Sequence, residues 1–226
     1  MQESTNSVLS TLEKRAEEKI ERMLKSHPFL QPFHSGTTTH AQLYRRHMVE
    51  AAFRIRMNNA VDSYALSTAI QDDPIAENLL VYLREEYGHD RMLEEDVRAM
   101  GMSEAELAET KPLFATDLLI AFLWRSVEQH GMLPALVWDW LVEWYSPRYN
   151  PQITNAAEAE FGSGSVRQAK RHLELDQELE HEDALTRAVV AVIERDGSLS
   201  KAEQYIDRFV RLIELYFHEL LAEVGL

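Results

Sequence analysis

The sequence predicts an all-α fold in a single domain over residues 1–226. Only 8 Gly and 7 Pro interrupt the chain, which favours long helices over short strands joined by turns. Ser or Thr followed three residues later by Glu or Gln, the capping box that begins a helix, recurs along the chain. No segment alternates apolar and polar residues with a period of two, and there is no internal repeat or linker.

Start and stop signals place the expected helices in order. They run from about residue 5 to 26, 40 to 70, 74 to 100, 113 to 145, 166 to 195 and 201 to 224, with a short turn near 103–110. We expect a bend near Gly131 and Pro134, and an irregular stretch containing Pro147 and Pro151. The start signals are the pairs Thr39/Gln42, Ser103/Glu106, Ser165/Gln168 and Ser200/Glu203, and the dipeptide Asp73-Pro74.

Composition excludes several classes of function. A net charge of −15 would repel a phosphate backbone, so we expect no nucleic-acid partner. The absence of cysteine excludes disulfides, cysteine zinc sites, iron–sulfur clusters and a thiol nucleophile. Residues 1–5 are neither basic nor apolar, and the longest apolar run, Leu118–Trp124, is too short to span a membrane. We therefore expect a cytoplasmic protein with no membrane partner.

Polar residues inside an apolar helix stripe indicate function, because burying a charge is costly unless it is paired or bound to metal. In the helix expected over 74–100, Glu86 and His89 fall on the same side as Leu79 and Leu93. A carboxylate and an imidazole one turn apart are typical of iron and manganese sites in helical bundles. The alternative interpretation is a partly exposed ion pair at the rim of the stripe.

The penultimate helix carries a second pair of this kind. Its apolar stripe extends backwards through His181, Glu178 and Glu174, so Glu178 and His181 form another Glu-x-x-His. His172 and Asp176 would project to roughly the opposite side of an ideal helix, unless a kink or π-bulge turned them back.

A ferritin-like site also needs one carboxylate from each remaining helix. Glu50 lies beside apolar residues of the second helix, and the helix over 113–145 offers Glu128 or Glu143, between which periodicity does not decide. Carboxylates and imidazoles without thiolates suit iron or manganese. The other histidines are interpreted as surface or structural residues, and the tryptophans of 124–144 as core packing that can also wall a substrate pocket.

Several segments resemble a known superfamily. The segment from Ser26 to Leu30, with Gly36 and the helix start at Thr39, resembles the N-terminal region of heme-oxygenase-like proteins. The segment 86–101, with Glu86-x-x-His89, is similar to the heme-oxygenase-like di-iron oxidases of that superfamily. Residues 171–176 are similar to the start of their last ligand helix, His-x-x-x-Asp-x-x-His. The resemblance implies a helical bundle of about seven helices.

By this resemblance the metal ligands are Glu86, His89, Glu128 or Glu143, His172 and Asp176. The last histidine of the motif should stand at position 179, where this sequence has Leu179. Three alternatives remain. The helix is distorted so that His181 serves, or the site is rebuilt around Glu174, Glu178 and His181, or the metal site is degenerate.

The resemblance implies a non-heme, di-iron, O₂-dependent oxidase or oxygenase with two iron ions per chain, acting on a small organic molecule such as an amino-acid or fatty-acid derivative. One alternative is a metal-free relative, like the thiaminase-like proteins or the quinone-cofactor oxidases, that processes a small heterocycle and pairs Glu86 with Arg54 or Arg56. Another is a non-enzymatic interaction or iron-storage protein. Thiamin-degrading members generally use a cysteine and heme oxygenases a histidine in the first helix, and this sequence has neither. A homodimer is the default expectation.

Overall fold

Helices make up the regular structure of the computed structural model, which describes residues 2–69 and 74–226. They are α1 (Gln2–Leu24), α2 (Leu30–His34), α3 (Ala41–Ser67), α4 (Pro74–Glu86), α5 (His89–Ala99), α6 (Glu104–Glu109), α7 (Phe114–His130), α8 (Leu133–Phe161), a 3-10 helix η1 (Ser163–Ser165), α9 (Arg167–Glu178), α10 (His181–Asp196) and α11 (Leu199–Glu223). No strand occurs within the described residues, so the all-α prediction is confirmed.

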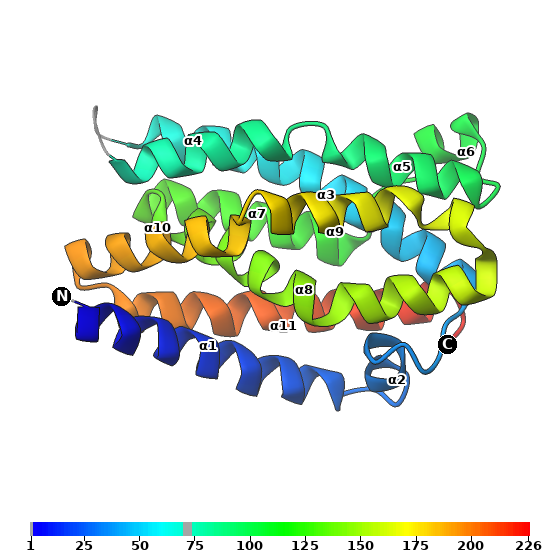
Figure 1. The fold of residues 1–226 in the computed structure, drawn as a ribbon, viewed down its shortest axis with the longest axis horizontal. Helices are drawn as coiled ribbons and strands as arrows, with labels where there is room; N and C mark the ends of the chain where they lie inside the picture. The colour runs from blue at the N-terminus through cyan, green and yellow to red at the C-terminus, as the bar shows by residue number, and fades with distance from the viewer. Residues whose placement is uncertain (1, 70–73) are drawn as a thin grey trace.

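The long helices run along the longest axis of the molecule (Figure 1). In α1, Leu12, Ala16 and Ile20 recur four residues apart and are fully buried, which is the apolar stripe of a helix packed on one side. α1 packs against α11, α3 packs against α5 and α7, and α8 packs against α7, α9, α10 and α11. α8 therefore runs through the centre of the bundle, where its side chains can meet those of the surrounding helices.

Two helices that were expected to be continuous are each interrupted once. The helix expected over 74–100 divides at Tyr87 and Gly88, where Gly88 has φ 100°. The helix expected over 166–195 divides at Leu179 and Glu180, where Glu180 has φ 53° and ψ 41°. Glu180 is the one residue other than glycine with a positive φ among those described, and this left-handed conformation ends the regular hydrogen bonding. Both breaks lie near the middle of the long axis (Figure 1).

α8 is longer than the sequence predicted. An irregular stretch was expected at Pro147 and Pro151, but α8 continues through both to Phe161. Proline fixes φ at a helical value, but inside a helix it removes one N–H donor and its ring clashes with the carbonyl four residues earlier. Extensive packing of α8 against four other helices can compensate for the lost hydrogen bonds. The helix expected over 113–145 is thus two helices, α7 and α8, separated at Gly131.

Most of the expected capping boxes are not formed. The pair Ser103/Glu106 is confirmed at the start of α6. At α3 the cap is His40, not Thr39, and the His40 side chain accepts a hydrogen bond from the Leu43 N–H. α11 starts at Leu199, before Ser200. Of the dipeptide Asp73-Pro74, Asp73 lies outside the described residues, and Pro74 is the first residue of α4.

The start of α9 is capped from a distant part of the chain. Ser165 makes no side-chain cap there. The Asp96 carboxylate, from α5, instead accepts hydrogen bonds from the N–H groups of Gln168 (3.0 Å) and Ala169 (2.7 Å). A carboxylate at a helix N-terminus satisfies free N–H groups and is favoured by the helix dipole. Asp96 therefore fixes α9 against α5.

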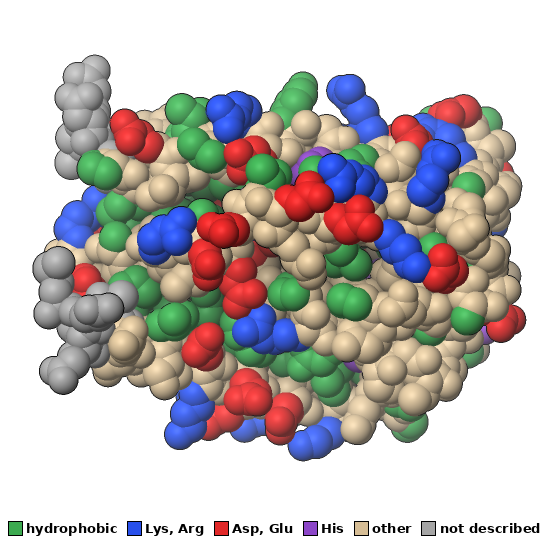
Figure 2. All heavy atoms as spheres, viewed as in Figure 1, with side chains coloured by type: hydrophobic (Ala, Val, Ile, Leu, Met, Phe, Trp, Pro, Cys, Tyr) green, Lys and Arg blue, Asp and Glu red, His purple; other side chains and the backbone are tan. Residues whose placement is uncertain are grey.

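Acidic side chains lie across the middle of the face shown in Figure 2, with Lys and Arg between them. Charged side chains on this face are thus exposed to solvent, as is usual for them. Within residues 2–69 and 74–226, no helix is both long enough and apolar enough to cross a bilayer.

Candidate metal centre

Six of the predicted ligands meet where the two helix breaks face each other. Glu86 is the last residue of α4 and His89 the first residue of α5. His172 and Asp176 lie one turn apart on α9, His181 is the first residue of α10, and Glu143 comes from α8. Five of the six are buried, and the His172 side chain is nearly so. The site is therefore assembled in the interior of the bundle from five helices.

The side chains form two groups of potential metal ligands that share one residue. In the first, donor atoms of Glu86, His89, His172 and Asp176 all lie within 4.8 Å of one another. In the second, donor atoms of Glu86, Glu143 and His181 do so. Glu86 has two carboxylate oxygens, so it can contribute to both groups at once. Glu86 could therefore help to hold a cation in either group.

Hydrogen bonding within the protein leaves four polar atoms of these residues without a partner. His172 Nε2, His181 Nδ1 and both carboxylate oxygens of Asp176 are buried without a hydrogen-bond partner. His172 Nδ1 does lie 3.0 Å from Asp176 Oδ2, but as an ion-pair contact without hydrogen-bond geometry. Buried polar atoms of this kind are costly unless something binds them. Oxygen and imidazole donors without thiolates fit iron or manganese.

Neighbouring charges within the cluster shift the pKa values of its residues. Burial alone would raise the pKa of Glu86, but the contacts and charges of His172 and His89 outweigh it and lower that pKa to about 2. Burial would lower the pKa of His172, but the contacts with Asp176 and Glu86 raise it well above its ordinary value. Burial, then the negative charges of Asp176 and Glu86, raises the pKa of Glu143 well above its ordinary range. A cation would relieve the repulsion among the three carboxylates.

A second acidic pair lies beside this cluster and was not anticipated from the sequence. Asn58 on α3 donates through its side-chain nitrogen to Asp62 (2.9 Å) and to Asp139 of α8 (2.9 Å). Burial raises the pKa of Asp139 to about 8, against the hydrogen bond from Asn58. Burial, with the charge of Asp139, raises the pKa of Asp62 well above its ordinary value. The pair therefore holds a proton at neutral pH.

The sequence carried a signal for both residues. Asp62 follows buried Val61 and is three residues from buried Ala65, and Asp139 stands between buried Trp138 and Trp140. Each is a carboxylate in an apolar stripe, the criterion that selected Glu86 and Glu143.

Glu50 is buried (0% exposed), as its stripe indicated, but lies in another part of the bundle interior. Its Oε1 accepts the Leu113 N–H (3.0 Å) and pairs with Arg46 (2.9 Å), and its Oε2 accepts the Thr116 hydroxyl. Glu50 therefore holds the start of α7 against α3, and the structure does not bring it into either ligand group.

Three other candidate carboxylates face solvent. Glu128 is exposed and pairs with Arg125 at 2.7 Å. Glu174 and Glu178 are exposed and both pair with Arg171. Between the two alternatives for the helix over 113–145, the structure therefore brings Glu143, not Glu128, to the cluster.

The break at Glu180 explains the unusual spacing of the last histidine. Leu179, at the position of the motif histidine, is 40% exposed. The left-handed turn at Glu180 shifts the start of α10 relative to α9 and brings His181 (1% exposed) to within 3.6 Å of Asp176. The structure thus corresponds to the first alternative, a helix distorted so that His181 reaches the cluster. Extrapolation of one continuous helix through this break misplaced Glu174 and Glu178.

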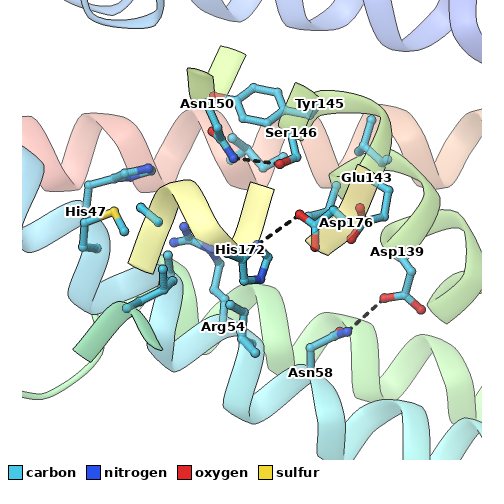
Figure 3. A pocket seen from close by; sticks show the side chains of 18 of the residues that line it. His47, Arg54, Asn58, Asp139, Glu143, Tyr145, Ser146, Asn150, His172 and Asp176 are labelled. Carbon is cyan, nitrogen blue, oxygen red and sulfur yellow. Dashed lines mark hydrogen bonds and ion pairs between the residues drawn. The ribbon is translucent and has the colours of Figure 1, made fainter. Parts of the chain in front are cut away.

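A cavity of about 190 Å³ opens beside the cluster. Glu86, Glu143, His172 and Asp176 line one part of it, and its wall is otherwise largely apolar. Figure 3 shows His172, Asp176 and Glu143 turned toward the same space, with the pair Asn58 and Asp139 beside them. Of the four tryptophans, Trp138 lines the cavity. The site therefore combines candidate ligands with room for a small molecule.

Comparisons with known proteins establish the fold. No protein-family model and no curated protein matches the chain. A domain of unknown function with a heme-oxygenase-like fold from Shewanella denitrificans OS217 superposes with a TM-score of 0.83 at 18% identity, over 96% of this chain and 93% of that one. A TenA homolog from Pseudomonas syringae pv. tomato DC3000 gives 0.75 at 13% identity, over 95% and 93%. A TenA family transcription regulator from Silicibacter sp. TM1040 gives 0.73 at 13%, over 98% and 99%. The chain has the heme-oxygenase-like fold, as the resemblance implied.

Proposed function

We propose that the protein is a non-heme, two-iron, O₂-dependent oxidase or oxygenase that acts on a small organic molecule held in the cavity beside Glu86. The observation that carries this proposal is the sharing of Glu86 by two groups of buried oxygen and nitrogen donors. A single metal ion would need only one such group. Two groups with a common carboxylate fit a pair of ions.

The chain's own residues would hold iron through Glu86, His89, His172 and Asp176 on one side, and through Glu86, Glu143 and His181 on the other. Bound iron would supply the electrons and open coordination positions that reaction with dioxygen requires.

Neighbouring side chains hold two of these candidate ligands, Glu143 and His181, in place. The Tyr82 hydroxyl donates a hydrogen bond to Glu143 Oε1 (3.0 Å), and His181 Nε2 lies 3.3 Å from Glu85 Oε2. Such outer contacts fix the orientation of ligand side chains and the tautomer of an imidazole. The proton held by Asp62 and Asp139 is available beside the cavity, and burial of the cluster excludes bulk water.

The arginine pairing expected of a metal-free relative is not formed. Arg56 pairs with Asp90 (2.7 Å) and Glu94. Arg54 lies over the Tyr216 ring, 4.4 Å from its centroid. Glu86 contacts histidines instead. The likeness to TenA proteins favours the metal-free reading as the second candidate, and the experiment below separates the two.

The test is O₂ uptake by the iron-loaded protein. Metal-stripped protein receives Fe(II) without air, excess iron is removed, and O₂ consumption is then recorded with an electrode. We expect uptake in proportion to bound iron in the wild type, and much less in Glu143→Ala and His89→Ala. Glu128→Ala is the matched control, because Glu128 is an exposed glutamate paired with Arg125. Uptake no greater than that of buffer, or unchanged in both site variants, would refute the proposal and favour the metal-free reading.

A further inference from the structure

Arg54 is a cation inside the cavity that has no anion paired with it. It projects from α3 into the cavity that Glu86 and Glu143 also line, and Figure 3 shows it between His47 and Asn58. Its Nη1 is buried without a hydrogen-bond partner. No Asp or Glu of the described residues lies within ion-pair distance of its guanidinium. A buried guanidinium nitrogen without a hydrogen-bond partner is costly, so Arg54 is suited to bind an anion that comes from outside the chain.

The residues that could have paired with Arg54 are already engaged. Glu50 lies four residues before Arg54 on α3, a spacing at which a carboxylate and a guanidinium can form an ion pair. Its two oxygens are taken by Arg46, by the Leu113 N–H and by the Thr116 hydroxyl. Asn58, one turn later, is bound to Asp62 and Asp139. The charge of Arg54 is therefore available to a ligand in the cavity.

Two further polar groups line the cavity, and the charge of Arg54 acts on both of them. The Tyr145 hydroxyl is buried without a hydrogen-bond partner. A phenol holds its proton at neutral pH, so the Tyr145 hydroxyl can donate a hydrogen bond to a ligand in the cavity. His47 lies 2.7 Å through Nδ1 from the Tyr216 hydroxyl. Burial, then the charges of Arg54 and His34, lowers the pKa of His47 well below its ordinary value, so its ring adds no second charge.

We infer that Arg54 and Tyr145 form a carboxylate-binding subsite, and that the molecule bound in the cavity is a small organic acid. A guanidinium matches the two oxygens of a carboxylate, and a phenol can add a third hydrogen bond. Identification of this acid as the substrate rests on the function proposed above.

The placement of Arg54 also orients the acid. Arg54 and Asn58 are one turn apart on α3, which is about 6 Å along the helix axis. Asn58 contacts Asp139, beside the candidate metal ligands. A carboxylate held by Arg54 would thus direct the rest of a short molecule along the largely apolar cavity toward Glu86 and Glu143. The oxidised atom would lie away from the carboxylate, at the other end of the acid.

The test compares three probes of equal chain length on the metal-free, full-length protein: hexanoate, hexan-1-ol and hexylamine. Metal-free protein is required because a carboxylate would also bind to iron. Calorimetric titration is expected to show hexanoate binding at least tenfold more tightly than the alcohol or the amine. Arg54→Met should weaken hexanoate binding by about 10- to 100-fold and leave the alcohol unaffected. Tyr145→Phe should weaken it by about 2- to 10-fold.

Two further variants keep the outcome interpretable. Arg54→Lys retains the charge without the planar fork, so it should bind hexanoate with intermediate affinity even if Arg54→Met folds poorly. Arg125→Met removes an exposed arginine and should change nothing. Equal affinity for hexanoate and hexan-1-ol in the wild type, including no binding of either, would overturn the inference. So would hexanoate binding that is unchanged in both Arg54 variants.

Two variants distinguish the carboxylate-binding subsite from the proposed oxidase function. Arg54→Met is expected to bind iron as the wild type does, because Arg54 belongs to neither ligand group. Glu86→Ala is expected to lose iron yet bind hexanoate in its metal-free form. Hexanoate selectivity without specific iron binding would leave the subsite standing and refute the oxidase.

Discussion

The buried pair Asp62 and Asp139 makes the stability of the metal-free protein depend on pH in an unusual direction. Burial raises the pKa of Asp139 from 3.8 to about 8. Below pH 4 both the folded and the unfolded chain hold this proton, so the raised pKa of Asp139 does not change the unfolding free energy. Between pH 4 and 8 only the unfolded chain releases it, and unfolding becomes more favourable as the pH rises.

The change Asp139→Asn removes this penalty while it keeps an oxygen that can accept the hydrogen bond from Asn58. From a pKa of 3.8 to pH 7, at about 1.4 kcal/mol per pH unit, the penalty reaches about 4 kcal/mol. The new amide N–H would replace Oδ2, which has no partner, at a cost of about 1–2 kcal/mol. We therefore expect the variant to be more stable than the wild type by about 2–3 kcal/mol at pH 7, and about equally stable at pH 5.

Urea unfolding of the metal-free proteins, followed by circular dichroism at pH 5, 6 and 7, measures this difference. Asp183→Asn is the matched control, because Asp183 is exposed on α10. It should change stability by less than about 1 kcal/mol at every pH. A variant less stable than the wild type at pH 7, or a difference that does not grow between pH 5 and pH 7, would refute the reasoning.

Three other changes test particular parts of the structure. Glu50→Ala removes the buried carboxylate that binds Arg46, the Leu113 N–H and the Thr116 hydroxyl, so it should lower the unfolding free energy by about 3–5 kcal/mol without changing iron stoichiometry. Urea unfolding and iron analysis check both results. Glu180→Gly should raise stability by about 0.5–1 kcal/mol, because glycine adopts the left-handed conformation freely, and a lower Tm would contradict this. Leu179→His should not restore iron binding to His181→Ala, because position 179 faces solvent; recovery of bound iron would show that the helix break is not fixed.

The all-α fold could be predicted from the sequence and is confirmed, and the proximity of Glu86 and His89 could be predicted because it depends on local sequence alone. Glu86 and His89 were expected on one face of a continuous helix. The structure has a break between them at Gly88, yet still brings both into one group. A pair three residues apart tolerates such a break because the two residues flank it directly.

The same method failed where a break separated residues that were farther apart. Placing Glu174 and Glu178 inward required the stripe of α10 to continue backwards through Glu180. A glutamate in the left-handed conformation has no sequence signature, because glycine or asparagine normally marks such a position. The resemblance to the motif His-x-x-x-Asp, by contrast, correctly selected His172 and Asp176 as members of the cluster.

Burial of a carboxylate could be predicted, but not its partner. Glu50 and Glu143 both lie within apolar stripes, and both are buried. Glu50 meets the start of α7, whereas Glu143 meets Glu86 and His181. These encounters depend on how distant helices pack, which one sequence does not specify. The unbroken course of α8 through Pro147 has the same origin, since packing by four helices outweighs the local effect of proline.

The number of iron ions bound per chain tests the sharing of Glu86 most directly. Metal-stripped protein is dialysed to equilibrium against Fe(II) without air, and its iron is then quantified, with Glu128→Ala as the control. We expect about two ions per chain in the wild type and the control, weakened binding in His181→Ala, and almost none in Glu86→Ala, because Glu86 belongs to both groups. No specific binding in the wild type, or two ions retained by Glu86→Ala, would contradict a two-iron centre built around this carboxylate.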